Sequence, residues 1–574
     1  MGLLKKSEHV KPLKVTSRGG AGGGVSSARP AQLEKEAPCL IGCPAGNGVR
    51  EWINTVSQRE RLHLPLEAAL DEAFRMLTQT NPLPAVMGRV CPHPCEDNCN
   101  RKTKDGAVAI NSLERFLGDW GLERHLTLPV LAPPGSQTEK IAVIGAGPAG
   151  LSCAYQLARR GYPVTLFESL PEAGGMLRYG IPDYRLPRDV LEKEVQRIVA
   201  LGVELKLGCA VGREVSFESL QQDYAAIFVA IGAHRGKKIR VPGEDGAGVY
   251  TGTEFLRQVA LGTAPRIGQR VAVIGGGDTA IDAARVSLRL AADSAELSQK
   301  LGADVTLFYR RTRTEMPAIE EEVVGALEEN VKIEFLAAPA RIERDERGQV
   351  TKLVLQRMRL GEPDSSGRRS PVPIEGEFIE FACDTVIAAV SQEPDFGTVG
   401  GPLAETRWLS ADAWGRTSLE RVFSGGDNVE LGLATIAVGQ GRKAAEAIHA
   451  TLRGEALPEA AKLKDIKPER LKIDYYDPKP RAERAKLDAP TRLAQPHAEI
   501  DHGITQEQFL DEASRCFSCG LCFGCERCWM FCTPSCFKKE ADPRLGHFYK
   551  VNLDTCDGCN KCAAECPCGF LEMV

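Results

Sequence analysis

The clearest pattern in the chain is a short apolar strand followed by a glycine-rich turn and an amphipathic helix. Residues 140–144 are predicted to form the strand, and a Gly-x-Gly-x-x-Gly turn opens the helix. A second apolar strand, residues 164–167, ends at an acidic residue. In such a unit the glycines let the backbone approach a pyrophosphate at the helix N-terminus, and the acid accepts ribose hydroxyls. The pattern therefore predicts a dinucleotide site formed by Gly145, Gly147, Gly150 and Glu168.

A second unit of this kind begins with a predicted strand at 271–274 and continues as a helix to residue 290. Its next strand, 304–309, ends in Arg310 and Arg311 rather than in an acid, and guanidinium groups suit a 2′-phosphate, which favours NADPH. Two alternatives stay open: the arginines cover a solvent-facing strand end, or an acid near Glu315 contacts the ribose of NADH. The turn residues expected to contact this second dinucleotide are Gly275, Gly277, Asp278 and Thr279.

A third element resembles the closing segment of a flavoprotein that has two dinucleotide-binding domains. An apolar strand runs from Val422 into Gly426 and Asp427, and residues 433–449 are predicted to be helical. In that fold Asp427 contacts the ribityl or pyrophosphate part of FAD, and the helix start near Thr435 faces the flavin. The fold class is thus α/β with two Rossmann-like domains. The predicted FAD domain is split, 133–251 and 384–455, and the predicted NAD(P)H domain, 252–383, is inserted in it.

Composition narrows the class of protein. The chain has 574 residues, which suggests roughly four domains at ~150 residues each. It is 43% hydrophobic and 26% charged, and no apolar run approaches the ~18 residues of a membrane helix. The net charge of -5 argues against nucleic acid as a partner. Residues 1–30 are basic, rich in glycine and without an apolar segment, so we expect a flexible tail rather than a secretory signal, and a cytoplasmic protein.

Twelve of the 20 cysteines lie between Cys516 and Cys568. Cys-x2-Cys-x2-Cys-x3-Cys occurs twice, and in two-cluster ferredoxins the fourth cysteine of each run binds the other cluster. We therefore expect an α+β ferredoxin-like domain at 510–574, although Thr533 stands where a proline usually follows the first run. The alternative is a pair of zinc ribbons, which would not use triplets at this spacing. The expected ligands are Cys522, Cys525, Cys528 and Cys566 for one 4Fe-4S cluster, and Cys556, Cys559, Cys562 and Cys532 for the other. Cys516, Cys519, Cys536 and Cys568 have no assignment.

Five further cysteines lie near the N-terminus, in a predicted helical domain at 31–132. Predicted helices at 49–56 and 66–77 separate them, so they meet only through folding. Their spacing favours an iron–sulfur site, and buried inert thiols are the alternative. These cysteines are Cys39, Cys43, Cys91, Cys95 and Cys99.

Residues 39–449 resemble the small subunit of glutamate synthase and its relatives, the electron-input domains of dihydropyrimidine dehydrogenase and of NAD(P)H:ferredoxin oxidoreductases. The matching motifs are Cys91-Pro92 with Cys95 and Cys99, Gly174 to Pro182 with Arg185-Leu186-Pro187, Tyr309-Arg310-Arg311, and Gly426-Asp427. The resemblance implies that the segment holding Gly175 and Arg185 lines the flavin and that Arg310 and Arg311 bind NADPH.

The resemblance also bears on the N-terminal cysteines. Family members bind two 4Fe-4S clusters here, but the Cys-x2-Cys pair expected before Cys39 is absent, so one cluster is expected. Matching positions give it Cys43, Cys91, Cys95 and Glu114. Cys39 and Cys99 would then be remnants of the lost site, and an all-cysteine set that uses either of them is the rival.

Function follows from these cofactors. NAD(P)H gives two electrons as hydride while each cluster accepts one, so FAD must stand between them. Cys153, Cys209 and Cys383 stand apart in sequence, which argues against a disulfide reductase. We expect an oxidoreductase subunit with one N-terminal and two C-terminal clusters, joined by a linker at 456–509, that exchanges electrons with a separate redox enzyme. By resemblance this partner is a sulfite reductase or a 2-oxoacid:ferredoxin oxidoreductase. The alternatives are a glutamate synthase small subunit serving an amidotransferase and a cluster-binding scaffold without turnover; a homodimer is left open.

Overall fold

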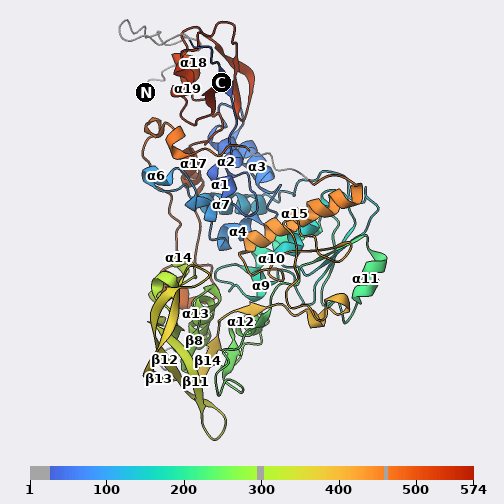
Figure 1. Ribbon diagram of the computed structural model, residues 1–574, viewed down its shortest axis with the longest axis vertical. Coiled ribbons are helices and arrows are strands. Elements are labelled where there is room, and N and C mark those ends of the chain that lie inside the picture. Colours follow the sequence, from blue (N-terminus) through green and yellow to red (C-terminus); the bar gives the residue numbers. More distant parts are fainter. Residues whose placement is uncertain (1–25, 294–302, 458–462) are drawn as a thin grey trace.

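The computed structural model describes residues 26–293, 303–457 and 463–574. Figure 1 shows an elongated arrangement, with the cysteine-rich C-terminal part at one end and the second dinucleotide-binding unit at the other. The N-terminal helices and the first dinucleotide-binding unit lie between them. No helix in these ranges is long and apolar enough to cross a membrane. Most of the expected tail, residues 1–25, lies outside the described part of the chain.

The first parallel sheet has the strand order β16-β5-β2-β3-β4. Its central strands are buried on both faces, which explains their continuous apolar sequence. Two distant parts of the chain build this sheet, because β16 adds to β5 after the second sheet has been completed. The strands are β2 (Ile141–Ile144), β3 (Val164–Phe167), β4 (Glu204–Lys206), β5 (Ala226–Val229) and β16 (Val422–Ser424). The helices of this unit are α8 (Pro148–Ala158), α9 (Met176–Tyr179), α10 (Arg188–Val199), α11 (Phe217–Asp223) and α15 (Ala434–Arg453).

The second parallel sheet has the order β10-β9-β8-β14-β7. Here the expected boundaries need correction: both 249–251 and 385–388 pair in this sheet, so the inserted unit reaches beyond 252–383 at each end. The strands are β7 (Val249–Thr251), β8 (Arg270–Ile274), β9 (Asp304–Tyr309), β10 (Lys332–Phe335) and β14 (Thr385–Ala388), with helices α12 (Gly252–Ala260), α13 (Asp278–Asp293) and α14 (Glu320–Glu328) and turn η1 (Arg313–Glu315).

An antiparallel meander extends this second unit. It consists of β11 (Ala337–Arg344), β12 (Val350–Pro363) and β13 (Arg369–Ala382). A short pair, β6 (Arg235–Gly236) and β15 (Gln392–Glu393), lies where the chain crosses between the two units. Two turns follow it, η2 (Phe396–Thr398) and η3 (Gly401–Leu403).

The N-terminal helices form a core of their own around Trp52 and Leu113, both fully buried. A helix from the far end of the chain, α17 (Gln506–Ser514), completes this core by inserting Phe509 and Ala513. The C-terminal part is therefore packed against the N-terminal helices. These helices are α1 (Pro38–Ile41), α2 (Val49–Ser57), α3 (Leu66–Leu77), α4 (Pro84–Val90), α5 (Pro94–Asp97), α6 (Lys102–Asp105) and α7 (Ile110–Glu123).

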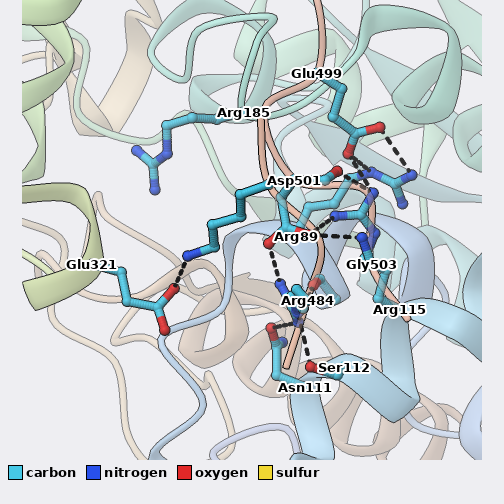
Figure 2. A network of polar contacts seen from close by, with 12 residues as sticks. Arg89, Asn111, Ser112, Arg115, Arg185, Glu321, Arg484, Glu499, Asp501 and Gly503 are labelled. Atoms are coloured by element: carbon cyan, nitrogen blue, oxygen red, sulfur yellow. Dashed lines mark hydrogen bonds and ion pairs between the residues drawn. The ribbon is translucent and has the colours of Figure 1, made fainter. Parts of the chain in front are cut away.

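Residues 463–505, which we call the strap, run along the body between α15 and α17. Figure 2 shows Glu499 and Asp501 of the strap beside buried arginines. Glu499 pairs with Arg89 at 2.7 Å and with Arg115 at 2.8 Å, and Asp501 pairs with Arg115 at 2.9 Å. Arg484 of the strap donates to Ser112 at 2.8 Å. Buried arginines that lose their acidic partners are costly, so these pairs hold the strap in place rather than leaving it a loose tether. The strap contains η4 (Pro468–Arg470), η5 (Ile473–Tyr475) and α16 (Ala489–Ala494).

The C-terminal part is a small α+β unit. A hairpin of β17 (Phe537–Arg544) and β18 (His547–Val551) accompanies two short helices, α18 (Arg527–Phe531) and α19 (Lys561–Ala564). The last strand, β19 (Leu571–Met573), pairs with β1 (Pro30–Gln32). The two ends of the described chain are thus joined in one sheet.

Candidate redox sites

A cavity of about 1020 Å³ lies between the two dinucleotide-binding units and is lined by residues of both. Its size is sufficient for a dinucleotide ligand, because cofactor sites usually occupy 300–1,000 Å³. Nine of the residues expected from sequence to bind FAD or NAD(P)H line it: Gly145, Gly147, Glu168, Gly175, Arg185, Asp278, Thr279, Gly426 and Asp427.

The first glycine turn shows why these glycines are needed. Gly145 has a φ of +100°, and a Cβ there would meet the Ala230 carbonyl oxygen at 2.3 Å. A Cβ at Gly150 would lie 1.9 Å from the Gly145 carbonyl oxygen. Gly150 therefore lets α8 pack closely on the turn but does not itself line the cavity. The backbone at this turn is exposed to a ligand, as a pyrophosphate site requires.

Glu168 ends β3 as predicted, with its side chain buried at the cavity wall. Its carboxylate accepts hydrogen bonds from the backbone N–H groups of Ala146 at 2.8 Å and Leu170 at 2.9 Å. Burial raises the pKa of Glu168, and these hydrogen bonds oppose the rise. The carboxylate is thus held in one orientation, in which it can accept ribose hydroxyls.

Asp427 lies on the opposite wall of the cavity, between β16 and α15. Burial raises its pKa to about 6, while a hydrogen bond from the Gly432 N–H acts in the other direction. The N-terminal residues of α15 that line the cavity are Leu433, Ala434 and Ala437. A helix start carries a partial positive charge, so this wall of the cavity favours a negatively charged ligand group.

The two arginines expected to bind NADPH are not at the cavity. Arg310 is exposed, and the Arg311 side chain is buried in an ion pair with Asp364 of the β12–β13 hairpin. Arg311 also donates to the Arg369 carbonyl oxygen at 2.7 Å. Its guanidinium group is therefore already satisfied within the chain. Gly275 and Gly277 of the second turn are likewise absent from the cavity wall; a Cβ at Gly275 would meet the Ala389 carbonyl oxygen at 2.2 Å.

Sequence reasoning missed a set of basic residues that do line the cavity. They follow β5, where the chain leaves the first sheet, or lie on α12. The sequence signal was the density of basic residues directly after a predicted strand. The set comprises His234, Arg235, Lys237, Lys238, Arg240 and Arg257. Such groups can hold the phosphates of a dinucleotide.

Arg185 lines the cavity but is also an anchor between the two units. It pairs with Asp282 at 2.7 Å and Glu322 at 3.1 Å, both in the second unit. Its neighbour Tyr184 is fully buried under the guanidinium groups of Arg285 and Arg289. The segment expected to line the flavin is therefore fixed against the second unit.

A small pocket adjoins the large cavity, which we call the flavin cavity after the ligand expected there, and is lined by Cys43, Cys91, Cys95 and Glu114, the four expected ligands of the N-terminal cluster. Burial raises the pKa of the Cys91 thiol to about 12, and a hydrogen bond with the Thr435 side chain opposes this. Burial likewise raises the pKa of Glu114 to about 7, against a hydrogen bond from Asn81. Cys39 and Cys99 do not line this pocket. The rival set that uses either of them is thus not supported by the geometry.

Only one layer of residues separates this pocket from the flavin cavity. Val90 and Pro92 line the cavity, while Cys91 between them lines the pocket. In the same way Ala434 lines the cavity and Thr435 lines the pocket. Thr435, expected beside the flavin, therefore lies on the cluster side of the wall.

A second pocket is lined by Cys39, Cys99, Cys516 and Cys519. It brings together two cysteines from the N-terminal helices and two from the C-terminal part. The spacing of cysteines in the sequence gave no ligand role to Cys516 or Cys519. The only signal in the sequence was the Cys-x2-Cys spacing of Cys516 and Cys519.

The C-terminal cysteines form two further groups. The Cys528 thiol lies close enough to Cys522, Cys525 and Cys566 for their charges to raise its pKa, in addition to the effect of burial. A separate pocket is lined by Cys532, Cys536, Cys556, Cys559 and Cys562. These groups contain the two expected ligand sets. Cys536, which had no assignment, adjoins the second, and its N–H lies 3.2 Å from the Cys532 sulfur.

Cys568 also had no assignment, and it contacts the first of these groups. Its sulfur lies 3.8 Å from that of Cys566. The hydrogen bond between these two sulfurs lowers the pKa of the Cys566 thiol to about 6, although burial acts to raise that pKa. A lowered pKa favours the thiolate, the form that binds a metal.

The donor chemistry of these groups fits iron–sulfur clusters. All 20 cysteines lie in the described ranges, and none is in a disulfide. Within those ranges no three His, Cys, Asp or Glu side chains are arranged to hold a single metal ion. Thiolates that surround a pocket, with backbone N–H groups directed at sulfur, are the ligands a 4Fe-4S cluster takes.

Comparisons with known proteins agree with this arrangement. Residues 139–441 match the model of the pyridine nucleotide-disulphide oxidoreductase family, and residues 26–126 match that of dihydropyrimidine dehydrogenase domain II, 4Fe-4S cluster. The solved structure of FprA from Mycobacterium tuberculosis superposes with a TM-score of 0.47 and 19% identity, over 56% of this chain and 88% of that one.

Three relatives share extended similarity. The NADPH-Fe(3+) oxidoreductase subunit beta of Geobacter sulfurreducens is 38% identical over 524 residues, which cover 84% of this chain and 75% of that protein. The NADP(+)-dependent formate dehydrogenase subunit beta of Moorella thermoacetica is 39% identical over 520 residues, covering 84% and 70%. The NADPH glutamate synthase small chain of Halomonas elongata is 36% identical over 431 residues, covering 71% and 87%. The chain belongs to the pyridine nucleotide-disulphide oxidoreductase family, in the group that is similar to the small chain of glutamate synthase.

Proposed function

We propose that this chain is an electron-transfer subunit that oxidises NADPH at a bound FAD and passes the electrons through 4Fe-4S clusters to a separate redox enzyme. The observation that carries the proposal is the wall at Cys91, which has the flavin cavity on one side and a cysteine pocket on the other. The two proposed redox sites thus share a wall, which supports direct electron transfer between them.

The residues around the cavity have distinct roles in this proposal. The turn at Gly145 and Gly147 holds the FAD pyrophosphate, and Glu168 holds the ribose hydroxyls. Asp427 and the start of α15 orient the flavin end. When bound, FAD supplies the chemistry that accepts a hydride and gives up electrons singly. The layer formed by Val90, Pro92 and Ala434 excludes water between the flavin and the cysteine pocket.

The second turn, at Asp278 and Thr279, places the nicotinamide coenzyme opposite the flavin. Arg310 is exposed and remains our candidate for the 2′-phosphate, because Arg311 is engaged with Asp364. The basic residues after β5 hold the remaining phosphate charge. Two relatives are named as NADPH- or NADP(+)-dependent, which supports NADPH as the coenzyme.

Three of the four cysteine groups hold one cluster each in this proposal. Cys43, Cys91, Cys95 and Glu114 hold the cluster beside the flavin. The C-terminal part holds two more: one on Cys522, Cys525, Cys528 and Cys566, the other on Cys532, Cys556, Cys559 and Cys562. Two relatives are named as beta subunits and one as a small chain, which supports a partner enzyme as the acceptor or donor. A sulfite reductase or a 2-oxoacid:ferredoxin oxidoreductase is the proposed partner type, and an amidotransferase is the alternative.

The test is anaerobic mixing of the purified flavoprotein with NADPH or NADH. We expect NADPH to bleach the flavin absorption near ~450 nm at a lower KM than NADH does, and the clusters then to become reduced. A flavin that neither coenzyme bleaches would contradict the proposal. Anaerobic co-purification from the native cell distinguishes the partners, since an amidotransferase would favour the alternative.

A further inference from the structure

Two pairs of cysteines that are more than four hundred positions apart in the chain line one pocket. Cys39 and Cys99 come from the N-terminal helices, and Cys516 and Cys519 come from the turn that follows α17. The rest of the wall is largely apolar, with Val49, Ile53 and Val108 among its residues. Burial raises the pKa of the Cys39 thiol, and the nearby Cys516, Cys519 and Cys99 raise it further. Four thiols therefore converge in a setting that disfavours free thiolates.

The surroundings of these sulfurs suit a bound cluster. The Asn54 side-chain amide donates to the Cys516 sulfur at 3.7 Å, and the Asn100 amide donates to the Cys519 sulfur at 3.5 Å. The backbone N–H of Ser518 also points at the Cys516 sulfur, at 3.4 Å. Such N–H donors surround the thiolates of iron–sulfur clusters and adjust their potentials. Neighbouring Arg50, whose side chain is 3% exposed, also lines the pocket and forms ion pairs with Glu34 and Glu51.

The turn that carries Cys516 and Cys519 is fixed from both sides. Arg515, with no exposed side-chain surface, pairs with Glu512 at 2.6 Å and with Asp105 of the N-terminal helices at 3.1 Å. Arg50 donates to the Cys519 carbonyl oxygen at 2.8 Å. Gly520 has a φ of +72°, and a Cβ there would meet Lys35 at 2.6 Å. These contacts thus hold Cys516 and Cys519 close to Cys39 and Cys99.

We propose that Cys39, Cys99, Cys516 and Cys519 hold a fourth 4Fe-4S cluster, which the C-terminal part completes across the domain interface. The Cys-x2-Cys spacing of Cys516 and Cys519 is that of cubane ligands, and Cys39 and Cys99 fill the other two positions. This site would replace two expectations, that Cys39 and Cys99 are remnants and that only one N-terminal cluster is present. It rests on the proposed function for its role in electron transfer.

The fourth cluster lies between the cluster beside the flavin and the C-terminal clusters. Cys95 of the flavin-side pocket and Cys39, Cys99 and Cys516 belong to the same apolar core. On the other side Cys519 belongs to the core that also contains Cys522, Cys525 and Cys566. Tyr476, whose hydroxyl donates to the Phe517 carbonyl oxygen at 2.7 Å, is buried at this junction. The cluster therefore connects two halves of a relay that would otherwise be interrupted.

The electron count of the relay balances. One NADPH gives a hydride to the flavin and leaves as NADP⁺, so two electrons enter. Each then passes singly: the cluster that gives it is oxidised by one electron, and the cluster that receives it is reduced by one. No covalent bond forms or breaks along the relay. The final acceptor is the partner enzyme of the proposed function.

The test compares the full-length protein with the Cys516→Ser/Cys519→Ser double variant, both prepared without oxygen. The wild type is expected to contain about 16 iron and 16 acid-labile sulfide atoms per chain, and the variant about 12 of each. The variant should lose one cluster signal in the EPR spectrum of the reduced protein. It should still bleach its flavin with NADPH, because hydride transfer to the flavin does not pass through this cluster, while electron delivery to the C-terminal clusters should slow.

The Cys39→Ser/Cys99→Ser variant should lose the same signal and the same amount of iron, since it removes the other half of the site. Cys383→Ala, a buried thiol of the second unit, should lose neither. Unchanged iron in the Cys516→Ser/Cys519→Ser variant, or zinc at this site in the wild type, would overturn the inference. If the double variants do not fold, Asn100→Ala keeps all four cysteines and should make one midpoint potential more negative; no shift would count against the site. Failure of NADPH to bleach the wild-type flavin would refute the proposed function, while the iron count still decides this inference.

Discussion

The Thr435 side chain is hydrogen-bonded to the Cys91 thiol, across the wall between the flavin cavity and the adjoining cysteine pocket. Thr435 belongs to the first turn of α15, while its neighbour Ala434 faces the cavity. One helix start therefore contacts both proposed redox centres. A change in the position of this helix turn would therefore affect both the reduction potential of the proposed cluster and the geometry of the proposed flavin site.

Replacing Thr435 with Val removes this hydrogen bond and keeps the side-chain volume. A hydrogen bond contributes about 1 kcal/mol, which is about 40 mV for a one-electron couple. We expect one cluster potential to become more negative by that amount in an EPR-monitored redox titration. Thr435→Ser retains a hydroxyl and serves as the control. Equal potentials in wild type and Thr435→Val would show that the hydrogen bond does not act on a cluster ligand.

Glu114 is the proposed non-cysteine ligand of the cluster beside the flavin. Glu114→Ala removes the ligand, so we expect loss of about four iron atoms or conversion of that cluster signal to a three-iron form. Glu114→Cys restores a ligand of the usual type and should retain the iron with an altered EPR spectrum. Iron content and spectrum unchanged in Glu114→Ala would exclude Glu114 as a ligand.

Arg310 and Arg311 are neighbours with different predicted effects. Arg310→Ala should raise the KM for NADPH about tenfold and leave the KM for NADH nearly unchanged, because a charge-assisted contact to a phosphate is worth about 1.5 kcal/mol or more. Arg311→Ala should lower stability, since it leaves Asp364 without its partner. Steady-state kinetics with both coenzymes make the comparison. An equal effect of Arg310→Ala on both KM values would argue against a 2′-phosphate contact.

Glu329 is fully buried between Arg285 and Arg289, the two arginines that cover Tyr184. Burial acts to raise its pKa, but the two arginines outweigh burial and lower the pKa to about 2. A carboxyl group whose pKa is lower in the folded state than in the unfolded state stabilises the fold. Its full contribution is present at pH values above the pKa of the unfolded state. That stability is lost as the pH falls from ~4.5 towards ~2.

Glu329→Gln leaves buried Arg289 without a charged partner and leaves Arg285 with Glu322 alone, so it should cost about 3 to 5 kcal/mol of unfolding free energy at pH 7. Its stability should also fall less steeply than that of the wild type between pH ~4.5 and ~2. Glu328→Gln removes a carboxylate that is half exposed, and it should cost less than about 1 kcal/mol. Denaturant titrations over this pH range give both quantities. Equal costs for the two variants would contradict the role assigned to Glu329.

The sequence predicted β3 and β9 with the bounds that the structure has, because buried parallel strands are short apolar runs with clear ends. The predicted boundaries placed residues 249–251 and 385–388 outside the second sheet. A short apolar run does not reveal which strand it pairs with. Arg311 was expected at the coenzyme because the sequence does not show that the β12–β13 hairpin brings Asp364 to it. Cysteine spacing grouped the C-terminal cysteines as the structure groups them, because both groups lie within one small unit. It could not join Cys39 to Cys516, because only the docking of α17 brings them together.

In the proposed function, NADPH gives two electrons to the flavin, which passes them singly to iron–sulfur clusters of the same chain. A stoichiometric anaerobic titration of the wild-type protein with NADPH, followed by flavin absorption and EPR on the same samples, tests this transfer directly. We expect the flavin to bleach and signals of reduced 4Fe-4S clusters to appear as the added NADPH is consumed. Protein that contains zinc and no acid-labile sulfide, or a flavin that is reduced without any cluster signal, would contradict it.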